Sequence, residues 1–142
     1  MATAMNAPIK ILVVDDDVQF TESIGELLEA YGYDVRVAHN GAEGLALARE
    51  LRPDLMILDV MMTTETEGFE VARRIPEAPE LKNMGILLVT GLTQSHQLPG
   101  GLRPDQTWLP VDRVLEKPIV PDHLILELER VLQERGRRQS PA

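Results

Sequence analysis

Residues 9–17 read IKILVVDDD, a run of apolar and mostly β-branched residues that ends in three consecutive aspartates. A run of this length without polar alternation is typical of a strand that is buried on both faces of a parallel sheet. Two further runs have the same form: LMIL at residues 55–58 is followed by Asp59, and ILLV at residues 86–89 is followed by Thr90. The sequence therefore predicts parallel strands whose carboxyl ends carry polar side chains.

The segments between these runs carry apolar residues at helical spacing, with Gly or Pro near the expected helix ends. The predicted helices cover residues 20–31, 41–51, 69–75 and 124–132, and further strands cover residues 33–38 and 114–115. This alternation predicts an α/β fold, a doubly wound parallel sheet of five strands with helices on both faces. Residues 91–112 contain three Gly and three Pro, which predicts a fourth helix that is short or replaced by a loop.

Length and composition are those of one domain. The chain has 142 residues, of which 44% are hydrophobic and 26% are charged, and a chain of this size can bury a core without disulfides or structural metals. It contains no Cys, which excludes a disulfide scaffold, a thiolate nucleophile and a thiolate zinc site. We expect one domain over residues 9–135, with flexible tails at residues 1–8 and 136–142.

The charge balance is acidic. There are 14 Lys and Arg residues against 23 Asp and Glu residues, a formal net charge of −9, which disfavours binding to nucleic acid or anionic lipid. The basic residues Arg135, Arg137 and Arg138 are expected to form a solvated tail. No apolar stretch is long enough to span a membrane, and the first eight residues lack the features of a secretory signal. We therefore expect a soluble cytoplasmic protein.

The polar residues that follow the predicted strands are Asp15, Asp16, Asp59, Thr90 and Lys117. Because the carboxyl ends of parallel strands meet at one edge of an open sheet, these side chains are expected to lie together. Clustered carboxylates repel one another unless a cation lies among them, and oxygen ligands of this kind suit Mg²⁺. A hydroxyl and an ammonium can bind the oxygens of a phosphoryl group, which a carboxylate can accept. The group is interpreted as a phosphoryl-accepting site, although each residue alone has an ordinary explanation such as a turn or helix cap.

Four motifs occur in order along the chain: ILVVDDD, LMILD followed by MM, LLVTG and LEKP. With these motifs the chain resembles the receiver domain of two-component response regulators, from about residue 9 to residue 135. The resemblance implies a flavodoxin-like fold with strand order 2-1-3-4-5. It also implies that Asp59 is the phosphoacceptor and that Mg²⁺ is the cofactor.

The resemblance assigns the other site residues one by one. The expected Mg²⁺ ligands are Asp15, Asp16, Asp59 and the backbone carbonyl of Met61. Thr90 would be the switch hydroxyl, and Lys117 would pair with Asp59 before phosphorylation and with the phosphoryl group after it. A cis Lys117–Pro118 bond is expected. Asp17 matches no ligand position of the family and is expected to cap a helix.

Three features depart from the usual pattern of the family. The loop at residues 61–68 is one residue longer, and its acidic run is expected to be a solvated tip, with an approach of Glu65 or Glu67 to the metal as the alternative. Val114 stands where many receivers carry Tyr or Phe, so the usual aromatic movement is not expected. The segment 91–112 replaces much of the usual fourth helix, so the dimer that relatives form through that face is not expected. Trp108 and Leu109 in this segment are expected to pack on the core, with a partner anchor as the alternative.

These expectations describe a phosphoacceptor switch of a two-component phosphorelay that acts through protein–protein interaction. A sensor histidine kinase or a phosphotransfer protein would donate the phosphoryl group. No output domain is expected, because only seven residues follow Arg135. The chain would not be an enzyme beyond its own phosphoryl transfer and slow dephosphorylation. Relatives place polar residues that position the hydrolytic water where this chain has the apolar Met61 and Leu92.

Two alternatives remain open at this point. An unphosphorylated, receiver-like interaction module is compatible with the altered loop and the missing aromatic residue. A metal-dependent phosphohydrolase with an aspartyl intermediate would need an acid/base carboxylate where Met61 stands. The sequence also leaves open the oligomeric state, the kinase, the target and the pathway.

Overall fold

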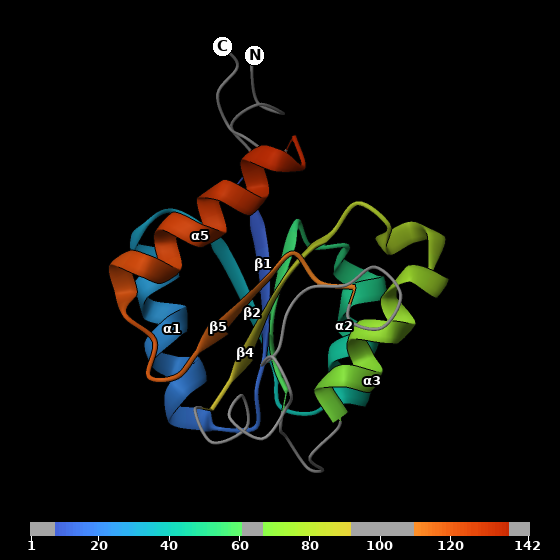
Figure 1. Ribbon diagram of the computed structural model, residues 1–142, viewed down its shortest axis with the longest axis horizontal. Helices are drawn as coiled ribbons and strands as arrows, with labels where there is room; N and C mark the ends of the chain where they lie inside the picture. The colour runs from blue at the N-terminus through green and yellow to red at the C-terminus, as the bar shows by residue number, and fades with distance from the viewer. Residues whose placement is uncertain (1–7, 61–66, 92–109, 137–142) are drawn as a thin grey trace.

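The computed structural model of the chain describes residues 8–60, 67–91 and 110–136. A parallel sheet of five strands runs through this part of the molecule (Figure 1). The strands stand in the order β2-β1-β3-β4-β5, which confirms the flavodoxin-like topology. Their bounds are β1 (Lys10–Val14), β2 (Asp34–Ala38), β3 (Leu55–Asp59), β4 (Gly85–Thr90) and β5 (Arg113–Glu116).

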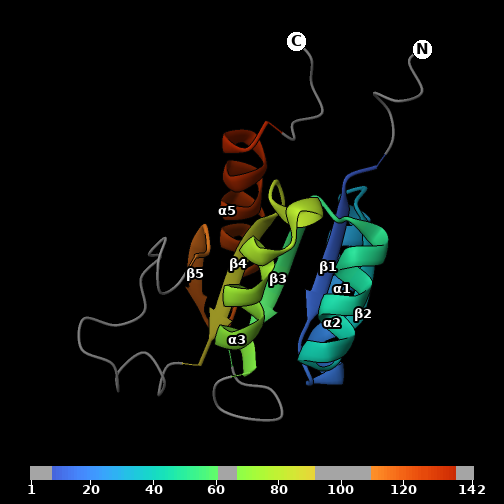
Figure 2. The same cartoon turned by 90° about the vertical axis from the view of Figure 1, so that its right-hand side faces the viewer.

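Helices cover both faces of the sheet, as predicted. Within the described residues, α1 (Val18–Ala30) and α5 (Pro121–Glu134) lie on one face, and α2 (Gly41–Leu51) and α3 (Glu67–Arg74) lie on the other. Figure 2 looks onto the face that α2 and α3 cover. The four helices predicted from the apolar spacing are all present, with ends that differ from the predicted ones by at most three residues.

The segment that follows α3 differs from the prediction. The sequence predicts helix up to Ile75, whereas α3 ends at Arg74 and two 3-10 turns follow, η2 (Ile75–Glu77) and η3 (Pro79–Leu81). Each turn has a Pro in its first positions, where the missing N–H leaves no hydrogen bond unmade. Ile75 and Leu81 are buried, so the two turns extend the apolar cover of the sheet beyond α3.

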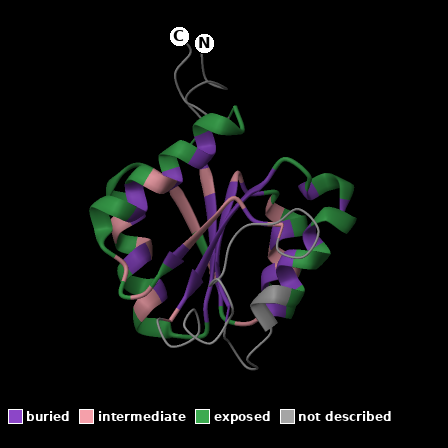
Figure 3. Cartoon of the chain, in the orientation of Figure 1, coloured by how far each residue is buried: buried purple, intermediate pink, exposed green. Residues whose placement is uncertain are grey.

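Alternate residues of the central strands belong to two separate core layers. In β1, Ile11 and Val13 pack in the layer beneath α1 and α5, whereas Leu12 and Val14 pack in the layer beneath α2 and α3. Both sets are buried, which explains why the strand reads as a continuous apolar run. The edge strands β2 and β5 are only partly buried (Figure 3). Polar side chains therefore gather at the strand ends rather than along the central strands.

At the amino end of the sheet, two aspartates that precede strands bind the backbone of neighbouring strands. Asp54 Oδ2 accepts a hydrogen bond from the Lys10 N–H at 2.9 Å. Asp112 Oδ2 accepts one from the Ile86 N–H at 2.8 Å. Each aspartate thus adds one hydrogen bond to the neighbouring strand, just before its own strand begins. Nothing in the sequence distinguishes either residue from an ordinary turn residue.

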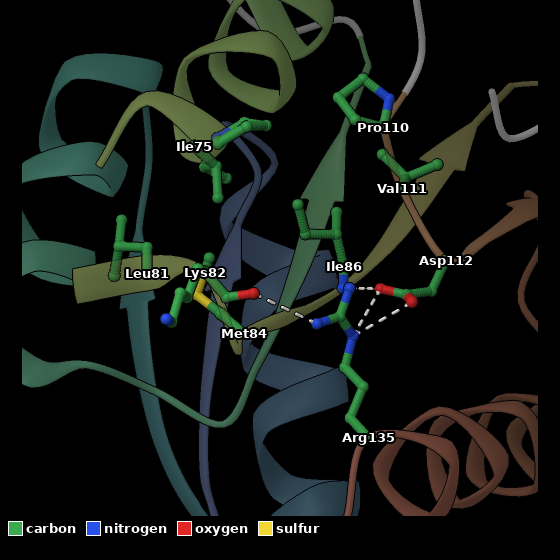
Figure 4. A pocket seen from close by; sticks show the side chains of 10 residues that line it. Ile75, Leu81, Lys82, Met84, Ile86, Pro110, Val111, Asp112 and Arg135 are labelled. Atoms are coloured by element: carbon green, nitrogen blue, oxygen red, sulfur yellow. Dashed lines mark hydrogen bonds and ion pairs between the residues drawn. The ribbon is translucent and has the colours of Figure 1, made fainter. Parts of the chain in front are cut away.

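Arg135, at the end of α5, contacts residues at the amino end of the sheet. This differs from the prediction that it belongs to a solvated tail. Its Nε lies 3.1 Å from both carboxylate oxygens of Asp112, and its Nη1 donates to the Lys82 carbonyl at 3.5 Å (Figure 4). A Cβ atom on Gly85 would lie 2.7 Å from Val131 Cγ1 and 3.3 Å from Arg135 Cδ. Gly85 therefore allows the last turns of α5 to approach the start of β4. Arg135, Asp112 and Lys82 border a hollow of about 430 Å³.

Several expectations fall on residues that the structure does not describe. They are the tails at residues 1–7 and 137–142, the loop at residues 61–66, and residues 92–109, which include Trp108 and Leu109. The predictions for these segments stay predictions. Among the described residues, no helix has the length and apolar character needed to cross a membrane.

Candidate functional site

The backbone ladder of the sheet continues past the strands and fixes the residues that follow them. The Asp15 N–H donates to the Ala38 carbonyl at 3.0 Å, which extends the pairing of β1 with β2. The Lys117 N–H donates to the Thr90 carbonyl at 2.7 Å, which extends the pairing of β4 with β5. Asp15 and Lys117 are therefore held by the rigid sheet, although they stand outside its strands.

The end of β1 is also fixed by close helix packing. A Cβ atom on Gly44 in α2 would lie 2.9 Å from both methyl carbons of Val14, closer than such atoms approach in folded proteins. Glycine at this position therefore lets α2 approach the last residue of β1. The aspartates that follow Val14 are positioned by this contact as well as by the ladder.

Asp15, Asp16 and Asp59 come together at the carboxyl end of the sheet. Each offers a carboxylate oxygen, and these atoms lie within 4.8 Å of one another. Asp15 and Asp59 are buried, with 1% and 6% of their surface exposed, whereas Asp16 is exposed. The structure thus assembles three of the predicted metal ligands. The fourth, the carbonyl of Met61, lies outside the described residues.

Burial sets the electrostatics of Asp15. Loss of hydration raises the pKa of its carboxyl above the ordinary value of 3.8, and the nearby charge of Asp16 acts in the same direction. Hydrogen bonds from the Asp17 N–H and from the Lys117 ammonium act to lower that pKa without offsetting the effect of burial. A cation beside the cluster would favour the ionised carboxylate. The donor set, which consists of oxygen atoms only, matches the preference of Mg²⁺.

Lys117 lies between the two buried carboxylates. Its Nζ donates to Asp15 Oδ2 at 3.0 Å and lies 4.0 Å from Asp59 Oδ1. The ion pair with Asp59 that the sequence resemblance implies is thus present at the longer distance. The hydrogen bond goes instead to Asp15, a partner that the sequence analysis did not consider.

Thr90 ends β4 beside the acid cluster formed by Asp15, Asp16 and Asp59. The register pairs Asp59 in β3 with Val89 in β4, so Thr90 lies one residue farther toward the same edge of the sheet. Thr90 is fully buried, and its hydroxyl donates to the Gly91 carbonyl at 3.2 Å. A hydroxyl that donates to a neighbouring carbonyl in this way can rotate toward another acceptor.

Three smaller expectations are tested by the described residues. Asp17 is the N-cap of α1, and its Oδ1 accepts from the Phe20 N–H at 3.1 Å. The Lys117–Pro118 bond is cis. Val114 is half-buried and packs against the core layer beneath α2 and α3. The first two confirm the sequence analysis, and the third shows an aliphatic side chain in the place where many receivers carry an aromatic one.

Phe20 belongs to the site, although the sequence analysis treated it as one apolar residue of a helix. The Lys117 Nζ lies 4.4 Å from the centroid of its ring. Phe20 also lines a hollow of about 630 Å³ between α1 and the segment after β5. The other residues that line this hollow are Ser23, Ile24, Leu27, Gly91, Lys117, Pro118, Ile119 and Pro121. The hollow is mostly apolar, and the Lys117 ammonium lies where it borders the acid cluster.

The arrangement can bind one cation and one phosphoryl group at the same edge. The carboxylates offer oxygen ligands, while Lys117 and Thr90 offer an ammonium and a hydroxyl for anionic oxygens. Asp59 is the buried carboxylate nearest in register to Thr90. The site residues singled out from the sequence are therefore brought together, apart from Met61, which is not described.

Comparison with known sequences gives a consistent result. Residues 11–129 match the family model for the response regulator receiver domain. The response regulator MprA of Mycobacterium sp. (strain KMS) is 34% identical over 134 residues, which are 94% of this chain and 53% of that protein. The DNA-binding dual master transcriptional regulator RpaA of Synechocystis sp. is 38% identical over 85 residues, 60% of this chain and 35% of that protein. The chain thus spans about half of the length of MprA and less of RpaA.

Solved structures match over nearly the whole chain. The chemotaxis response regulator CheY4 of Vibrio cholerae superposes with a TM-score of 0.75 at 31% identity, covering 89% of this chain and 100% of that chain. The CheY-like receiver domain protein of Methanospirillum hungatei superposes with a TM-score of 0.72 at 29% identity, covering 92% of this chain and 98% of that one. Sequence and fold therefore lead to the same family.

Proposed function

The chain belongs to the family of response regulator receiver domains, and from that premise we propose that it is a phosphoacceptor switch whose phosphorylated residue is Asp59. The observation that carries the proposal is the convergence of Asp15, Asp16 and Asp59 within 4.8 Å, with the Lys117 ammonium between the two buried carboxylates. Three carboxylates gathered around a single ammonium repel one another, and a bound cation would relieve that repulsion.

The proposed reaction is transfer of a phosphoryl group to the Asp59 carboxylate. A carboxylate oxygen attacks phosphorus, the new O–P bond forms, and the bond from phosphorus to the donor breaks. A donor imidazole leaves with the electron pair and takes a proton from solvent. The Lys117 ammonium binds an oxygen of the transferred group, and Thr90 turns its hydroxyl from the Gly91 carbonyl toward another oxygen.

The residues present fit a Mg²⁺ ion. Asp15, Asp16 and Asp59 supply oxygen ligands, and the exposed Asp16 leaves room for the waters that Mg²⁺ usually keeps. The carbonyl of Met61 stays part of the proposed ligand set. When bound, the ion would neutralise the charge that Asp59 and the incoming phosphoryl group bring together.

We propose a histidine kinase or a phosphotransfer protein as the donor. Receiver domains accept phosphoryl groups from such proteins, and the apolar hollow beside Lys117 offers a contact surface next to the acid cluster. The transferred group adds negative charge where the loops after β3, β4 and β5 begin. This change is expected to alter the affinity for a protein target.

The phosphorylated state is proposed to be long-lived. Met61 and Leu92 are apolar at the two positions where relatives place residues that orient water. We expect the signal to end through a partner or through return transfer to the donor. After removal of the donor, a decay of the phosphorylated protein within seconds would contradict this part of the proposal.

The experiment is incubation with a small phosphodonor such as acetyl phosphate, with and without Mg²⁺, followed by measurement of the intact protein mass. We expect addition of one phosphoryl group that requires Mg²⁺ and that is abolished by the Asp59→Ala substitution. A chelator provides the metal-free arm of the experiment. No uptake by a folded wild-type protein would refute the proposal and would favour the unphosphorylated interaction module.

A further inference from the structure

Lys117 has a neighbour besides the two carboxylates. Its Nζ lies 4.4 Å from the centroid of the Phe20 ring, a distance at which an ammonium is attracted by the negative face of an aromatic ring. The same atom donates to Asp15 Oδ2 at 3.0 Å. The ammonium therefore has an aromatic contact in addition to its hydrogen bond and its longer ion pair with Asp59.

Phe20 is itself fixed relative to the acid cluster. Its N–H donates to Oδ1 of Asp17, the N-cap of α1, at 3.1 Å, and the Asp17 N–H donates to Asp15 Oδ1 at 2.9 Å. Asp15 Oδ2 accepts from Lys117, and the Lys117 ammonium lies over the Phe20 ring. The four residues thus form a closed cycle of three hydrogen bonds and one cation–π contact.

This cycle ties the ring to the backbone of the first turn of α1. Helix packing holds that turn as well, because Phe20 packs against the core layer beneath α1 and α5. The hydrogen bond fixes the backbone of Phe20 and the core packing restricts its ring, whereas Lys117 carries its charge on a flexible four-carbon stem. An anchor of this kind reduces the number of positions that the ammonium can occupy.

Packing alone does not require an aromatic residue at this position. Phe20 is half-buried, and the neighbouring apolar residues of α1 that line the same hollow, Ile24 and Leu27, are aliphatic. A leucine would continue their apolar stripe at helical spacing. An aromatic ring adds a face that attracts a cation.

We propose that Phe20 is a positioning residue for Lys117. Its ring keeps the Lys117 ammonium at the acid cluster, where the ammonium can bind an oxygen of the phosphoryl group on Asp59. The reaction part of this inference rests on the proposed function, since the role of Lys117 in phosphoryl transfer is itself proposed. The contact between the ring and the ammonium does not depend on it.

The first test uses the unphosphorylated protein in the presence of a chelator. The methylene protons next to the Lys117 ammonium are measured by NMR in the wild type, in Phe20→Leu and in Phe20→Tyr. We expect a ring-current shift in the wild type and in Phe20→Tyr, and its loss in Phe20→Leu. Absence of the shift in the wild type would overturn the inference.

The second test measures the rate of phosphorylation by acetyl phosphate at saturating Mg²⁺ in the same three proteins. Loss of the ring is expected to lower the rate about two- to fivefold, and Phe20→Tyr is expected to restore it, since a cation–π contact at a partly exposed site is modest. Mg²⁺ affinity, followed by binding calorimetry, is not expected to weaken in Phe20→Leu. Weakening of both rate and affinity would indicate a disturbed site and would count against a positioning role.

Tyr31→Leu is the matched control, because it makes the same aromatic-to-leucine change at the C-cap of α1, where Tyr31 is exposed and does not line the hollow. We expect it to change neither the Lys117 resonances nor the rate. An equal loss of rate in Tyr31→Leu and Phe20→Leu would overturn the inference, as would a wild-type rate in Phe20→Leu. If the wild type takes up no phosphoryl group, the proposed function fails together with the reaction part. The NMR measurement then still decides whether the ring holds the ammonium.

Discussion

The two ends of the sheet use the same side chain for opposite purposes. At the amino end, Asp54 and Asp112 each accept a backbone N–H from a neighbouring strand. At the carboxyl end, Asp15, Asp16 and Asp59 face one another within 4.8 Å. The first pair join neighbouring strands, whereas the second group concentrates negative charge that a bound cation would offset.

The difference shows how an aspartate at a strand end can be classified from its partners. A carboxylate that accepts an N–H from a neighbouring strand stabilises the fold, because its removal would leave that N–H without its acceptor. Carboxylates that are buried beside one another lose hydration and repel, so they cost stability in the absence of a cation. Substitutions at the two ends are therefore expected to have opposite consequences for stability and for ligand binding.

The largest expected effect separates the two ends by their response to Mg²⁺. A ligand that binds only the folded state raises the free energy of unfolding by about 2.7 kcal/mol at a hundred times its dissociation constant. We expect the wild type and Asp54→Asn to be stabilised by Mg²⁺ and Asp16→Asn to lose most of that stabilisation. Denaturant unfolding with Mg²⁺ and with a chelator measures this difference. Equal stabilisation of Asp16→Asn and Asp54→Asn would remove the distinction between the two ends.

The next effect is a loss of stability at the amino end. Asp112→Ala removes the acceptor of the Ile86 N–H and the partner of Arg135, and we expect it to lower the free energy of unfolding by about 1–3 kcal/mol. Asp112→Asn keeps an oxygen for the Ile86 N–H and is expected to lose less. Phosphorylation of the folded protein should be unchanged in both variants. A marked loss of phosphorylation with stability intact would mean that the amino end takes part in the site.

A smaller effect concerns the pH dependence of stability. Burial raises the pKa of Asp15 in the folded protein above 3.8, so the folded state binds its proton more tightly than the unfolded chain does. The contribution of Asp15 to stability is therefore present below about pH 3.8 and is lost as the pH rises through the folded-state pKa. In the presence of a chelator, the wild type should lose stability relative to Asp15→Asn as the pH rises from about 3.8 through the folded-state pKa of Asp15. If the difference in free energy of unfolding between the two proteins did not vary with pH, burial could not be the cause of a raised Asp15 pKa.

The smallest effect is expected at Arg135. Its pair with Asp112 is partly exposed, with 31% of the Arg135 side chain accessible, and such pairs contribute about 0–1 kcal/mol. Arg135→Gln should therefore lower the free energy of unfolding by no more than about 1 kcal/mol, and salt should reduce the difference. A loss as large as that of Asp112→Ala would show that the guanidinium, rather than the Ile86 N–H, is the main partner of this carboxylate.

The polar residues at the carboxyl end of the sheet could be predicted from the sequence, because each of them directly follows an apolar run along the chain. Each apolar run is buried on both faces and stops where a polar residue begins, so the run marks both the strand and the residue at its end. The parallel arrangement then brings Asp15, Asp59 and Lys117 to one edge. The order of the strands required the resemblance to a known family, because apolar runs do not state which strand lies beside which.

The amino end and the finer contacts could not be predicted in the same way. An aspartate before a strand, such as Asp54 or Asp112, reads as an ordinary turn residue, because its partner lies on another strand. Arg135 reads as part of a basic tail until Gly85 is seen to admit the end of α5. The Lys117 ammonium lies 3.0 Å from Asp15 and 4.0 Å from Asp59, and a difference this small between two side-chain distances cannot be read from a sequence. The place of Phe20 depends on the packing of α1.

The most direct test of the central claim is to identify which residue carries the phosphoryl group. The protein is phosphorylated with acetyl phosphate and Mg²⁺ and then reduced with borohydride, which converts an aspartyl phosphate to homoserine, and the converted position is found by peptide mass spectrometry. We expect homoserine at position 59 and nowhere else in the acid cluster. Homoserine at position 15 or 16, with position 59 unchanged, would contradict it.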